Sequence, residues 1–312
     1  MILFGCLIMY PTEGLLKFVS PELVFGNRAR LLASRYAKNL GAKKVFIVTD
    51  PGIIKTGLVS ELSEFLTNEN KEYEIFSDLT VNPKDYEIMD GADKFLESQS
   101  NFIIAIGGGS VLDCAKGIAM VATNKKHILD FVGVDKVDVP LPPLVCIPTT
   151  AGSGADISQF AVVSDTVNNL KKVIVSKSII PDVSLIDPST TLTADYDLTL
   201  VSGIDAAVHV AESYVSNASA SFTDLIALDT LKSIGQYLPN ALYDPGNLFY
   251  RSKVMAAATQ AGLCFSNTGL GLVHAMAHVV GGFYDLVHGE INAALFPYVL
   301  EYNFDAEPKK NI

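Results

Sequence analysis

Three of the five histidines in this 312-residue chain lie in one short stretch, "HAMAHVVGGFYDLVHG", at residues 274–289. His274 and His278 are four residues apart, and His288 follows a glycine pair that we expect to break or redirect the helix. Imidazole is a common ligand of divalent transition metals. The stretch therefore suggests that these histidines share a metal ion or a catalytic task.

An earlier stretch, "SGIDAAVHVAE" (202–212), supplies further ligand types. Asp205 and His209 are four residues apart, so both side chains leave the same face of a helix. A lone histidine on an apolar helix is usually a core or surface residue, but a carboxylate and several imidazoles among small apolar residues would be costly to bury without partners. Such ligands suit Fe(II), Zn(II), Mn(II) or Co(II), and the lack of thiolates disfavours a closed structural zinc site. His127, beside two lysines, is expected to be exposed and uninvolved.

A glycine triplet, Gly107 to Gly109, joins an apolar strand to a helix in "IIAIGGGSVLDCAK" (103–116). Glycines let the backbone approach a ligand closely, and a helix start offers free N–H groups to an anion such as a pyrophosphate. The spacing is not that of the usual dinucleotide fingerprint. An ordinary tight strand-to-helix turn therefore stays open as the alternative.

A second polar turn, "PTTAGSGAD" (148–156), offers the hydroxyls of Thr149, Thr150 and Ser153 after another buried strand. Two such turns at strand ends are what a nucleotide crevice in an open α/β sheet requires. Asp50, which ends the strand "VFIVTD", could accept hydrogen bonds from an adenosine ribose and would repel a 2′-phosphate. The alternative for this residue is a turn-forming aspartate before a proline.

The elements that must position these residues alternate in the first part of the chain. Strands are predicted over residues 43–50, 73–78, 101–107, 143–150 and 183–188. Helices are predicted over residues 28–40, 85–98, 110–123, 222–242 and 250–265. Because strands and helices alternate at first and strand-like runs vanish after residue 195, we expect a parallel sheet covered by helices, followed by an all-helical part.

The chain length favours two domains. We expect an α/β nucleotide-binding domain over residues 1–190 and a helical metal-binding domain over residues 191–312. The opening run "MILFGCLIMY" is too short to span a membrane and lacks a signal-peptide pattern. We interpret it as an arm or an edge strand.

Composition excludes several classes of function. With 34 acidic and 23 basic residues, the net charge of −11 argues against a nucleic-acid partner. The four cysteines are scattered and form no CxxC pair, which fits a reducing cytoplasm better than a disulfide framework.

Taken together, these motifs resemble the iron-containing (group III) alcohol dehydrogenases. The matching stretches are "GGGSVLDCAK", "PTTAGSGAD", "IDPSTTLT", "GIDAAVHVAESYVS" and "GLVHAMAHVVGGFYDLVHGEINAALFPYVLEYN", in family order. The resemblance runs from about Phe18 to Asn303, and its most specific part is the histidine-bearing motif. It implies an architecture like that of dehydroquinate synthase, with an NAD-binding α/β domain and an all-α metal-binding domain.

The resemblance also implies roles for individual residues. The metal ligands would be Asp205, His209, His274 and His288. His278 would be catalytic, close to the nicotinamide and the substrate, and we expect it to relay a proton. The cofactor-binding residues would be Asp50, Asn82, Gly108, Gly109, Ser110, Asp113, Thr149, Thr150, Ser153 and Lys172.

The function implied is that of a metal- and NAD(H)-dependent alcohol dehydrogenase or aldehyde reductase of short-chain primary alcohols or diols. Fe(II) is the metal of the family, Zn(II) is also compatible, and a cytoplasmic homodimer or larger homo-oligomer is expected. One alternative is a zinc-dependent polyol dehydrogenase of glycerol type. Another is a non-catalytic metal- or nucleotide-binding fragment, because family members continue beyond "EPKKNI" and the second domain would be C-terminally shortened. A lyase of the dehydroquinate synthase type would need a basic cluster near the histidines, and the sequence has none there.

Overall fold

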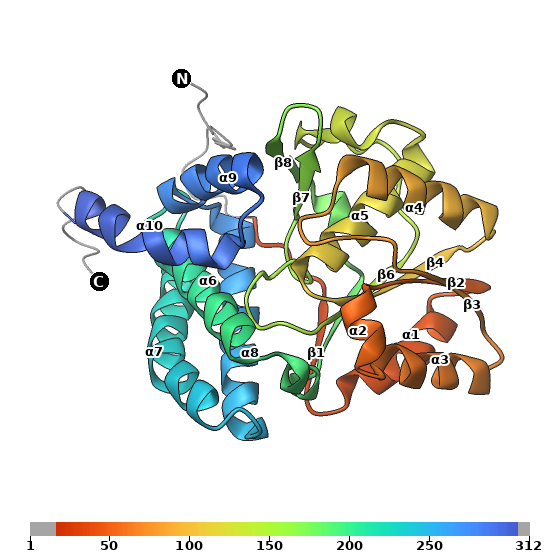
Figure 1. Ribbon diagram of the computed structural model, residues 1–312, viewed down its shortest axis with the longest axis horizontal. Coiled ribbons are helices and arrows are strands. Elements are labelled where there is room, and N and C mark those ends of the chain that lie inside the picture. Colours follow the sequence, from red (N-terminus) through yellow and green to blue (C-terminus); the bar gives the residue numbers. More distant parts are fainter. Residues whose placement is uncertain (1–16, 305–312) are drawn as a thin grey trace.

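The structure is a computed structural model that describes residues 17–304, so the predicted arm at residues 1–10 lies outside the described part. An α/β part with a central sheet is followed by a part built of helices alone (Figure 1). The predicted fold class is confirmed.

The central sheet has six strands in the order β1-β9-β6-β4-β2-β3, and every pair is parallel. The strands are β1 (Glu22–Phe25), β2 (Lys44–Val48), β3 (Glu72–Phe76), β4 (Phe102–Gly107), β6 (Leu144–Pro148) and β9 (Val183–Ile186). All the strands predicted in this region are present, and β1 is an addition at the edge. Between β2 and β4 the order of connection reverses, and ligands of open α/β sheets bind at the carboxyl ends of such strands.

Helices cover both faces of the sheet because alternate residues of each buried strand point to opposite sides. Val45 and Ile47 lie in the apolar core with α1 (Ala33–Asn39) and α3 (Leu58–Asn68). Phe46 and Val48 lie in the core with α4 (Asp85–Glu97) and α5 (Gly109–Asn124). Short helices at α2 (Pro51–Lys55), η1 (Ala29–Leu32), η2 (Ile128–Phe131) and η3 (Lys177–Ile179) complete the α/β part. The predicted helices 28–40, 85–98 and 110–123 are thus found.

A small second sheet has the order β5-β8-β7 and was not predicted. Its strands are β5 (Gly133–Val134), β7 (Phe160–Asp165) and β8 (Leu170–Val175), with β7 and β8 forming an antiparallel hairpin. This hairpin packs against α5 on one side and reaches the helical part on the other. The hairpin therefore contacts both the α/β part and the helical part, next to any site that lies between them.

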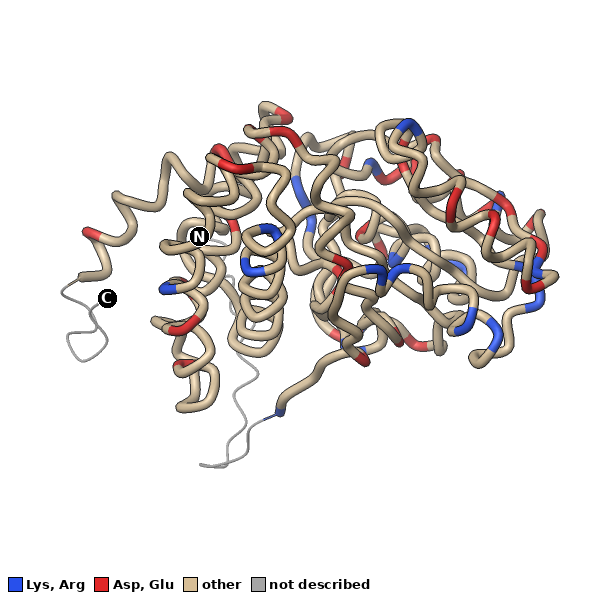
Figure 2. Tube along the Cα trace, turned by 90° about the horizontal axis from the view of Figure 1, so that it is seen from below, with Lys and Arg blue, Asp and Glu red and all other residues tan. Residues whose placement is uncertain are grey.

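The helical part follows η4 (Pro188–Thr193). It comprises α6 (Tyr196–Tyr214), α7 (Ser221–Tyr243), α8 (Leu248–Thr268), α9 (Leu272–Tyr284) and α10 (His288–Asn303). Charged residues are dense over the α/β part and sparse along α10 (Figure 2). Among the described helices, none is by itself long and apolar enough to cross a membrane, and only α8 and α9 together, bent by 98°, meet that test.

The prediction that Gly281 and Gly282 break the histidine-bearing helix is wrong, because both lie inside α9. A Cβ atom on Gly282 would stand 2.6 Å from the backbone nitrogen of Lys171 in β8. The glycines therefore let α9 lie directly against the β7–β8 hairpin. The chain turns instead at Asp285, whose φ of 51° is left-handed, before α10 begins at His288.

Candidate metal and cofactor site

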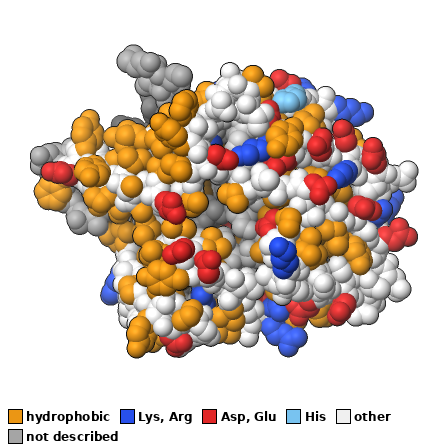
Figure 3. Space-filling view, viewed as in Figure 1, with side chains coloured by type: hydrophobic (Ala, Val, Ile, Leu, Met, Phe, Trp, Pro, Cys, Tyr) orange, Lys and Arg blue, Asp and Glu red, His pale blue; other side chains and the backbone are white. Residues whose placement is uncertain are grey.

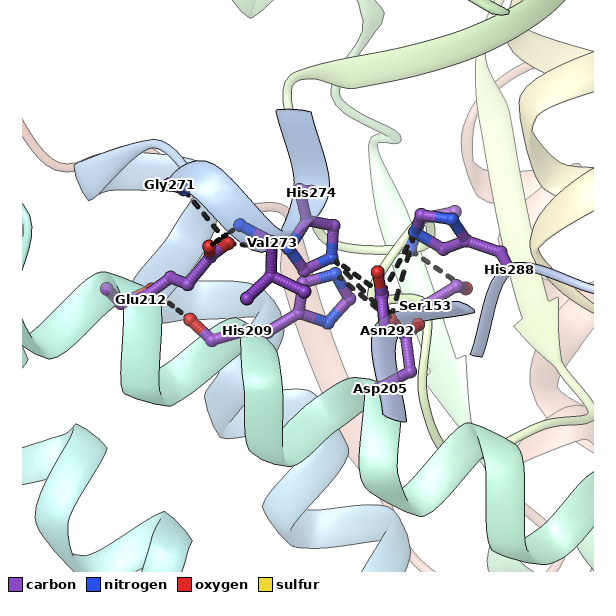
Figure 4. Close-up of polar contacts among 11 residues, drawn as sticks. Ser153, Asp205, His209, Glu212, Gly271, Val273, His274, His288 and Asn292 are labelled. Carbon is purple, nitrogen blue, oxygen red and sulfur yellow. Dashed lines mark hydrogen bonds and ion pairs between the residues drawn. The ribbon is translucent and has the colours of Figure 1, made fainter. Parts of the chain in front are cut away.

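Helix α6 presents three ionisable side chains on one face, since Asp205, His209 and Glu212 follow at helical spacing. All three are buried, with 4–6% of their surface exposed. Helix α9 brings His274 to this face, and α10 brings His288 from its first residue (Figure 4). The four ligands predicted from the sequence are thus brought together from three helices.

The geometry of the four side chains suits a metal ion. The Oδ1 atom of Asp205 lies 3.8 Å from Nε2 of His209, 3.6 Å from Nε2 of His274 and 3.9 Å from Nε2 of His288. The ligand atoms of Asp205, His209 and His274 all lie within 4.8 Å of one another. A tetrahedral ion bound at roughly 2.1 Å separates its ligands by about 3.4 Å. Small shifts would therefore close this set around one ion.

Glu212 orients one of the ligands from behind. Its carboxylate lies 2.7 Å from Nδ1 of His274 and also accepts hydrogen bonds from the backbone N–H groups of Gly271 and Val273. An imidazole that donates from Nδ1 keeps the lone pair of Nε2 for a metal. Glu212 therefore fixes the tautomer in which His274 can act as a ligand.

The protonation of the cluster follows from burial and from the two carboxylates. Burial works against ionisation of Asp205, yet the surrounding histidines hold its pKa well below the usual range. Burial lowers the pKa of His209 to about 4 and that of His288 to about 3. Burial also opposes charge on His274, but its hydrogen bonds with Asp205 and Glu212 outweigh this and raise its pKa to about 9. At neutral pH the cluster thus offers a carboxylate and two unprotonated imidazoles.

His278 lies next to the cluster without joining it. Its ring centre is 5.1 Å from that of His288 and 6.2 Å from that of His274. Burial and the neighbouring histidines push its pKa well below the usual value, and its Nδ1 atom has no partner among the described residues. The side chain lines the same cleft as the ligands. His127, in contrast, is exposed on the α/β part, as predicted.

A cleft of about 1770 Å³ connects the histidines with the carboxyl ends of β2 and β4. Its walls include the two glycine-rich turns, the cluster ligands and Phe265, whose ring stacks on His209 at 4.3 Å. The space is much larger than a short alcohol requires. It can hold an extended ligand reaching from the sheet to the helices.

The two glycine-rich turns form one continuous wall of this cleft. A Cβ atom on Gly108 would come within 3.5 Å of Thr150, and one on Gly109 would come within 2.8 Å of Ser153. Gly108 stands directly before α5, so free N–H groups of that helix border the cleft. Among the other predicted cofactor residues, Ser110 and Thr149 also line the cleft. This wall fits a diphosphate, because only glycine leaves room for close backbone approach.

Asp50 and Asp113 each show a structural role alongside their place in the cleft. Asp50 caps α2 by accepting hydrogen bonds from the N–H groups of Gly52 and Ile53, so the turn-forming interpretation is realised. Asp113 accepts from the N–H of Val162 and thereby ties α5 to β7. Its second oxygen is buried without a hydrogen bond among the described residues and lies 4.0 Å from Nζ of Lys116. Burial raises the pKa of this carboxyl to about 6.

Lys172, which the sequence assigns to the cofactor site, is not among the residues that line the cleft, whereas its neighbour Lys171 is. Side chains of a strand alternate, and on β8 the cleft is lined by Lys171, Val173 and Val175. Lys171 is buried and donates to Oδ1 of Asn82, a predicted cofactor residue that also lines the cleft. Burial lowers the pKa of Lys171 to about 8.

Sequence reasoning also missed Glu212 and Asn292. Glu212 follows Asp205 by two helical turns, and Asn292 follows His288 by one turn, so each shares the face of a predicted ligand. This spacing can be seen in the sequence. It does not single out the two residues, because an acid or an amide one or two turns from another polar residue is common on any helix. Only the packing of α6, α9 and α10 shows that both side chains touch the ligands.

Comparison with known families agrees with the two parts of the fold. A family described as iron-containing alcohol dehydrogenase matches residues 20–188. The C-terminal part of the Fe-containing alcohol dehydrogenase family matches residues 199–311.

Individual relatives point in the same direction. A 1,3-propanediol dehydrogenase of Klebsiella pneumoniae is 38% identical over 92% of this chain and 74% of its own length. An NAD-dependent methanol dehydrogenase of Bacillus methanolicus is 35% identical over 94% of this chain and 77% of its own. A crystal structure of 1,3-propanediol oxidoreductase superposes with a TM-score of 0.92 at 36% identity, covering 95% of this chain and 78% of that one.

Proposed function

The chain belongs to the family of iron-containing alcohol dehydrogenases and is an NAD-dependent oxidoreductase of short-chain alcohols or diols, and from this premise we propose which residues carry the reaction. The observation that supports the assignment is the convergence of Asp205, His209, His274 and His288 at one end of a cleft whose other end is the glycine-rich wall. A substrate at the histidines and a nicotinamide entering from the sheet would meet between them.

We assign metal binding to Asp205, His209, His274 and His288. A divalent metal would supply Lewis-acid chemistry there, polarising the C–O group of the alcohol or aldehyde. The donor set of one carboxylate and three imidazoles fits Fe(II), the metal after which the family is described, and also fits Zn(II). Asp205, His209 and His274 are buried, which limits the access of bulk water to the reacting groups.

We assign cofactor binding to the wall opposite the histidines. Gly108, Gly109 and Ser110 would receive the diphosphate at the start of α5, with Thr149, Thr150 and Ser153 beside it. Asp50 keeps one carboxylate oxygen free of its capping bonds, which favours a ribose hydroxyl and disfavours a 2′-phosphate. Asn82, Asp113 and Lys171 complete the site, with Lys171 replacing Lys172.

His278 is proposed as the group that passes the alcohol proton towards solvent. Its place beside His274 and His288, outside the ligand set, supports this role. Substitution by glutamine removes a titrating nitrogen while keeping a polar side chain. The His278→Gln variant is expected to lose most of its kcat at unchanged metal content. Full activity in this variant would remove His278 from the mechanism.

One experiment tests the function as a whole. The purified chain is loaded anaerobically with Fe(II) or, separately, with Zn(II), and NADH oxidation is followed with a panel of short aldehydes and diol-derived hydroxyaldehydes. We expect turnover that disappears together with the bound metal in His274→Ala. Tight binding of metal and NADH without turnover of any aldehyde would instead support the non-catalytic fragment.

Self-association is proposed as well. Large apolar side chains are exposed on α9, α10 and the turn between them, and Figure 3 shows orange side chains gathered over this region. They include Val279, Phe283, Tyr284, Tyr298, Tyr302 and Phe304. A patch of this kind usually marks an interface, and we assign it to a second copy of the chain. Sedimentation of the wild type as a monomer at micromolar concentration would refute this.

Two further expectations keep the status of proposals. Division into domains near residue 190 is supported by the gap between the two family matches, at residues 188 and 199. A cytoplasmic location is supported by Cys114, Cys146 and Cys264, which are free and buried.

A further inference from the structure

The side chain of Asn292 lies among the ligands that we assign to the metal. Asn292 is fully buried on α10, one turn after His288. Its Nδ2 atom is 2.7 Å from Oδ1 of Asp205 and 3.2 Å from Nε2 of both His274 and His288. Three of the four assigned ligand atoms therefore face one amide nitrogen, as the dashed lines in Figure 4 show.

An amide nitrogen can donate hydrogen bonds but has no lone pair for a metal. Here Nδ2 donates to the Asp205 carboxylate and stands within hydrogen-bond reach of both imidazoles. The Nε2 lone pair of a histidine either accepts a hydrogen bond or binds a metal, and it cannot do both. A hydrogen bond from the amide to Nε2 of His288 and binding of a metal to that atom therefore exclude each other.

The oxygen of the Asn292 amide does not help to orient the side chain. The Oδ1 atom of Asn292 is buried and has no hydrogen-bond partner among residues 17–304. The contacts of Nδ2 thus decide how the side chain is placed. A buried amide with one unpartnered end is costly, which indicates that the contacts of the other end matter to the site.

We propose that Asn292 is a placeholder for the metal ion: the two N–H groups of its amide bond to Asp205 and His288 when no metal is bound, and the metal must displace the amide from His288. The proposal rests on the proposed function, because it takes these residues as the ligands. Asn292 would then stabilise the metal-free site and lower its metal affinity. It is a positioning residue for metal loading and takes no part in hydride transfer.

The test measures Co(II) binding to the metal-free chain in competition with a chelator, using the visible absorption of bound Co(II). We expect Asn292→Ala to bind Co(II) at least about threefold more tightly than the wild type, because the metal no longer displaces a hydrogen-bonded amide. Thermal unfolding gives a second readout. The Tm of the metal-free variant should fall more than the Tm of its Co(II)-loaded form.

A matched control is Asn101→Ala. The Asn101 side chain is likewise held by hydrogen bonds, with the N–H of Lys43 and the carbonyl of Gly41, but it lies in the α/β part away from the histidines. This variant should lower Tm equally with and without Co(II) and leave the Co(II) Kd unchanged. If Asn292→Ala does not fold, Asn292→Ser is used, whose shorter side chain withdraws from the imidazoles, and the same tightening is expected.

An unchanged or weaker Co(II) affinity in the Asn292 variants would overturn the placeholder role while leaving the metal centre in place. Equal loss of Tm with and without Co(II) would do the same, since it would show a purely structural role. A wild-type chain that binds no Co(II) would overturn both the placeholder and the proposed metal centre. The two failures are therefore distinguishable.

Discussion

At the scale of single residues, the site depends on groups that hold the ligands as much as on the ligands. His274 is a usable ligand because Glu212 accepts a hydrogen bond from the N–H of its other ring nitrogen. Lys171 is a candidate for the cofactor because burial on β8 aims it into the cleft, whereas Lys172 faces away. Neither distinction is visible in the residue types alone.

The Glu212→Gln substitution is expected to weaken metal binding about 10- to 100-fold, which is the usual cost of losing such a supporting carboxylate. Glutamine keeps the size of the side chain but can no longer hold a proton on Nδ1 of His274 by charge. Co(II) competition with a chelator measures the change. Glu64→Gln, on the exposed face of α3, serves as the control and should match the wild type. An unaltered Kd in Glu212→Gln would show that His274 needs no partner.

Affinity for NADH is expected to fall as pH rises through about 8, the pKa to which burial lowers Lys171. Below this pH the ammonium is charged and attracts the anionic cofactor, and above it the amine is neutral. We expect NADH binding to weaken roughly threefold or more between pH 6.5 and pH 9.5, measured by fluorescence titration. Lys171→Met should abolish the pH dependence, and Lys172→Met, on the opposite side of the same strand, should retain it. The same slope in both variants would contradict the assignment.

At the scale of elements, the position of His274 and His278 depends on how closely α9 approaches the β7–β8 hairpin. Gly281 and Gly282 make this contact possible, since added Cβ atoms would meet the side chain and backbone of Lys171. The hairpin thus links the helix that carries two histidines to the strand that carries the buried lysine. A displacement of α9 would therefore also displace β8.

Gly282→Ala is therefore expected to lower the free energy of unfolding by about 1–3 kcal/mol, as overpacking in a core does. It should also weaken metal binding, because α9 must move away from β8. Gly235→Ala is the control, since Gly235 lies inside α7 with open space around it and should gain about 0.5–1 kcal/mol. Denaturant unfolding measures both. Equal stability of Gly282→Ala and the wild type would show that α9 does not need this close approach.

At the scale of the whole molecule, the turn between α9 and α10 is tied across the cleft to the α/β part. Asp285 accepts a hydrogen bond from Nδ2 of Asn82 at 2.9 Å and forms an ion pair with Lys84 at 3.0 Å. Asn82 in turn accepts from Lys171. A chain of contacts thus joins the segment just before His288 to the cofactor wall.

Asp285→Ala is expected to change stability little, by less than about 1 kcal/mol, because an ion pair this exposed contributes weakly. Burial dominates the pKa of Lys171, and the charge of Asp285 opposes that effect by raising it. Removing Asp285 should therefore move the midpoint of the NADH pH dependence below 8. Asp244→Ala, on the far end of α7, is the comparison and should leave the midpoint in place. A midpoint that stays near 8 in Asp285→Ala would show that the two parts are not linked here.

The sequence alone determined five of the six strands of the central sheet, the helices over residues 28–40, 85–98 and 110–123, the metal ligands as candidates, and the family. These follow from local signals: apolar periodicity, glycines at strand ends, and histidines at helical spacing. The β7–β8 hairpin was not predicted from the sequence, because its two strands depend on each other and on α9. Asp285, not the glycine pair, turns the chain, because the glycines are needed for contact with β8.

Only the tertiary structure decided which polar neighbours serve the ligands. Glu212, Asn292 and Lys171 are ordinary residues at ordinary positions, and they differ from the rest only by what other helices and strands place against them. Their partners are 62, 87 and 89 residues away along the chain. Hydrogen bonds and burial act over a few ångströms in space, so the pattern along the sequence carries no trace of contacts that distant.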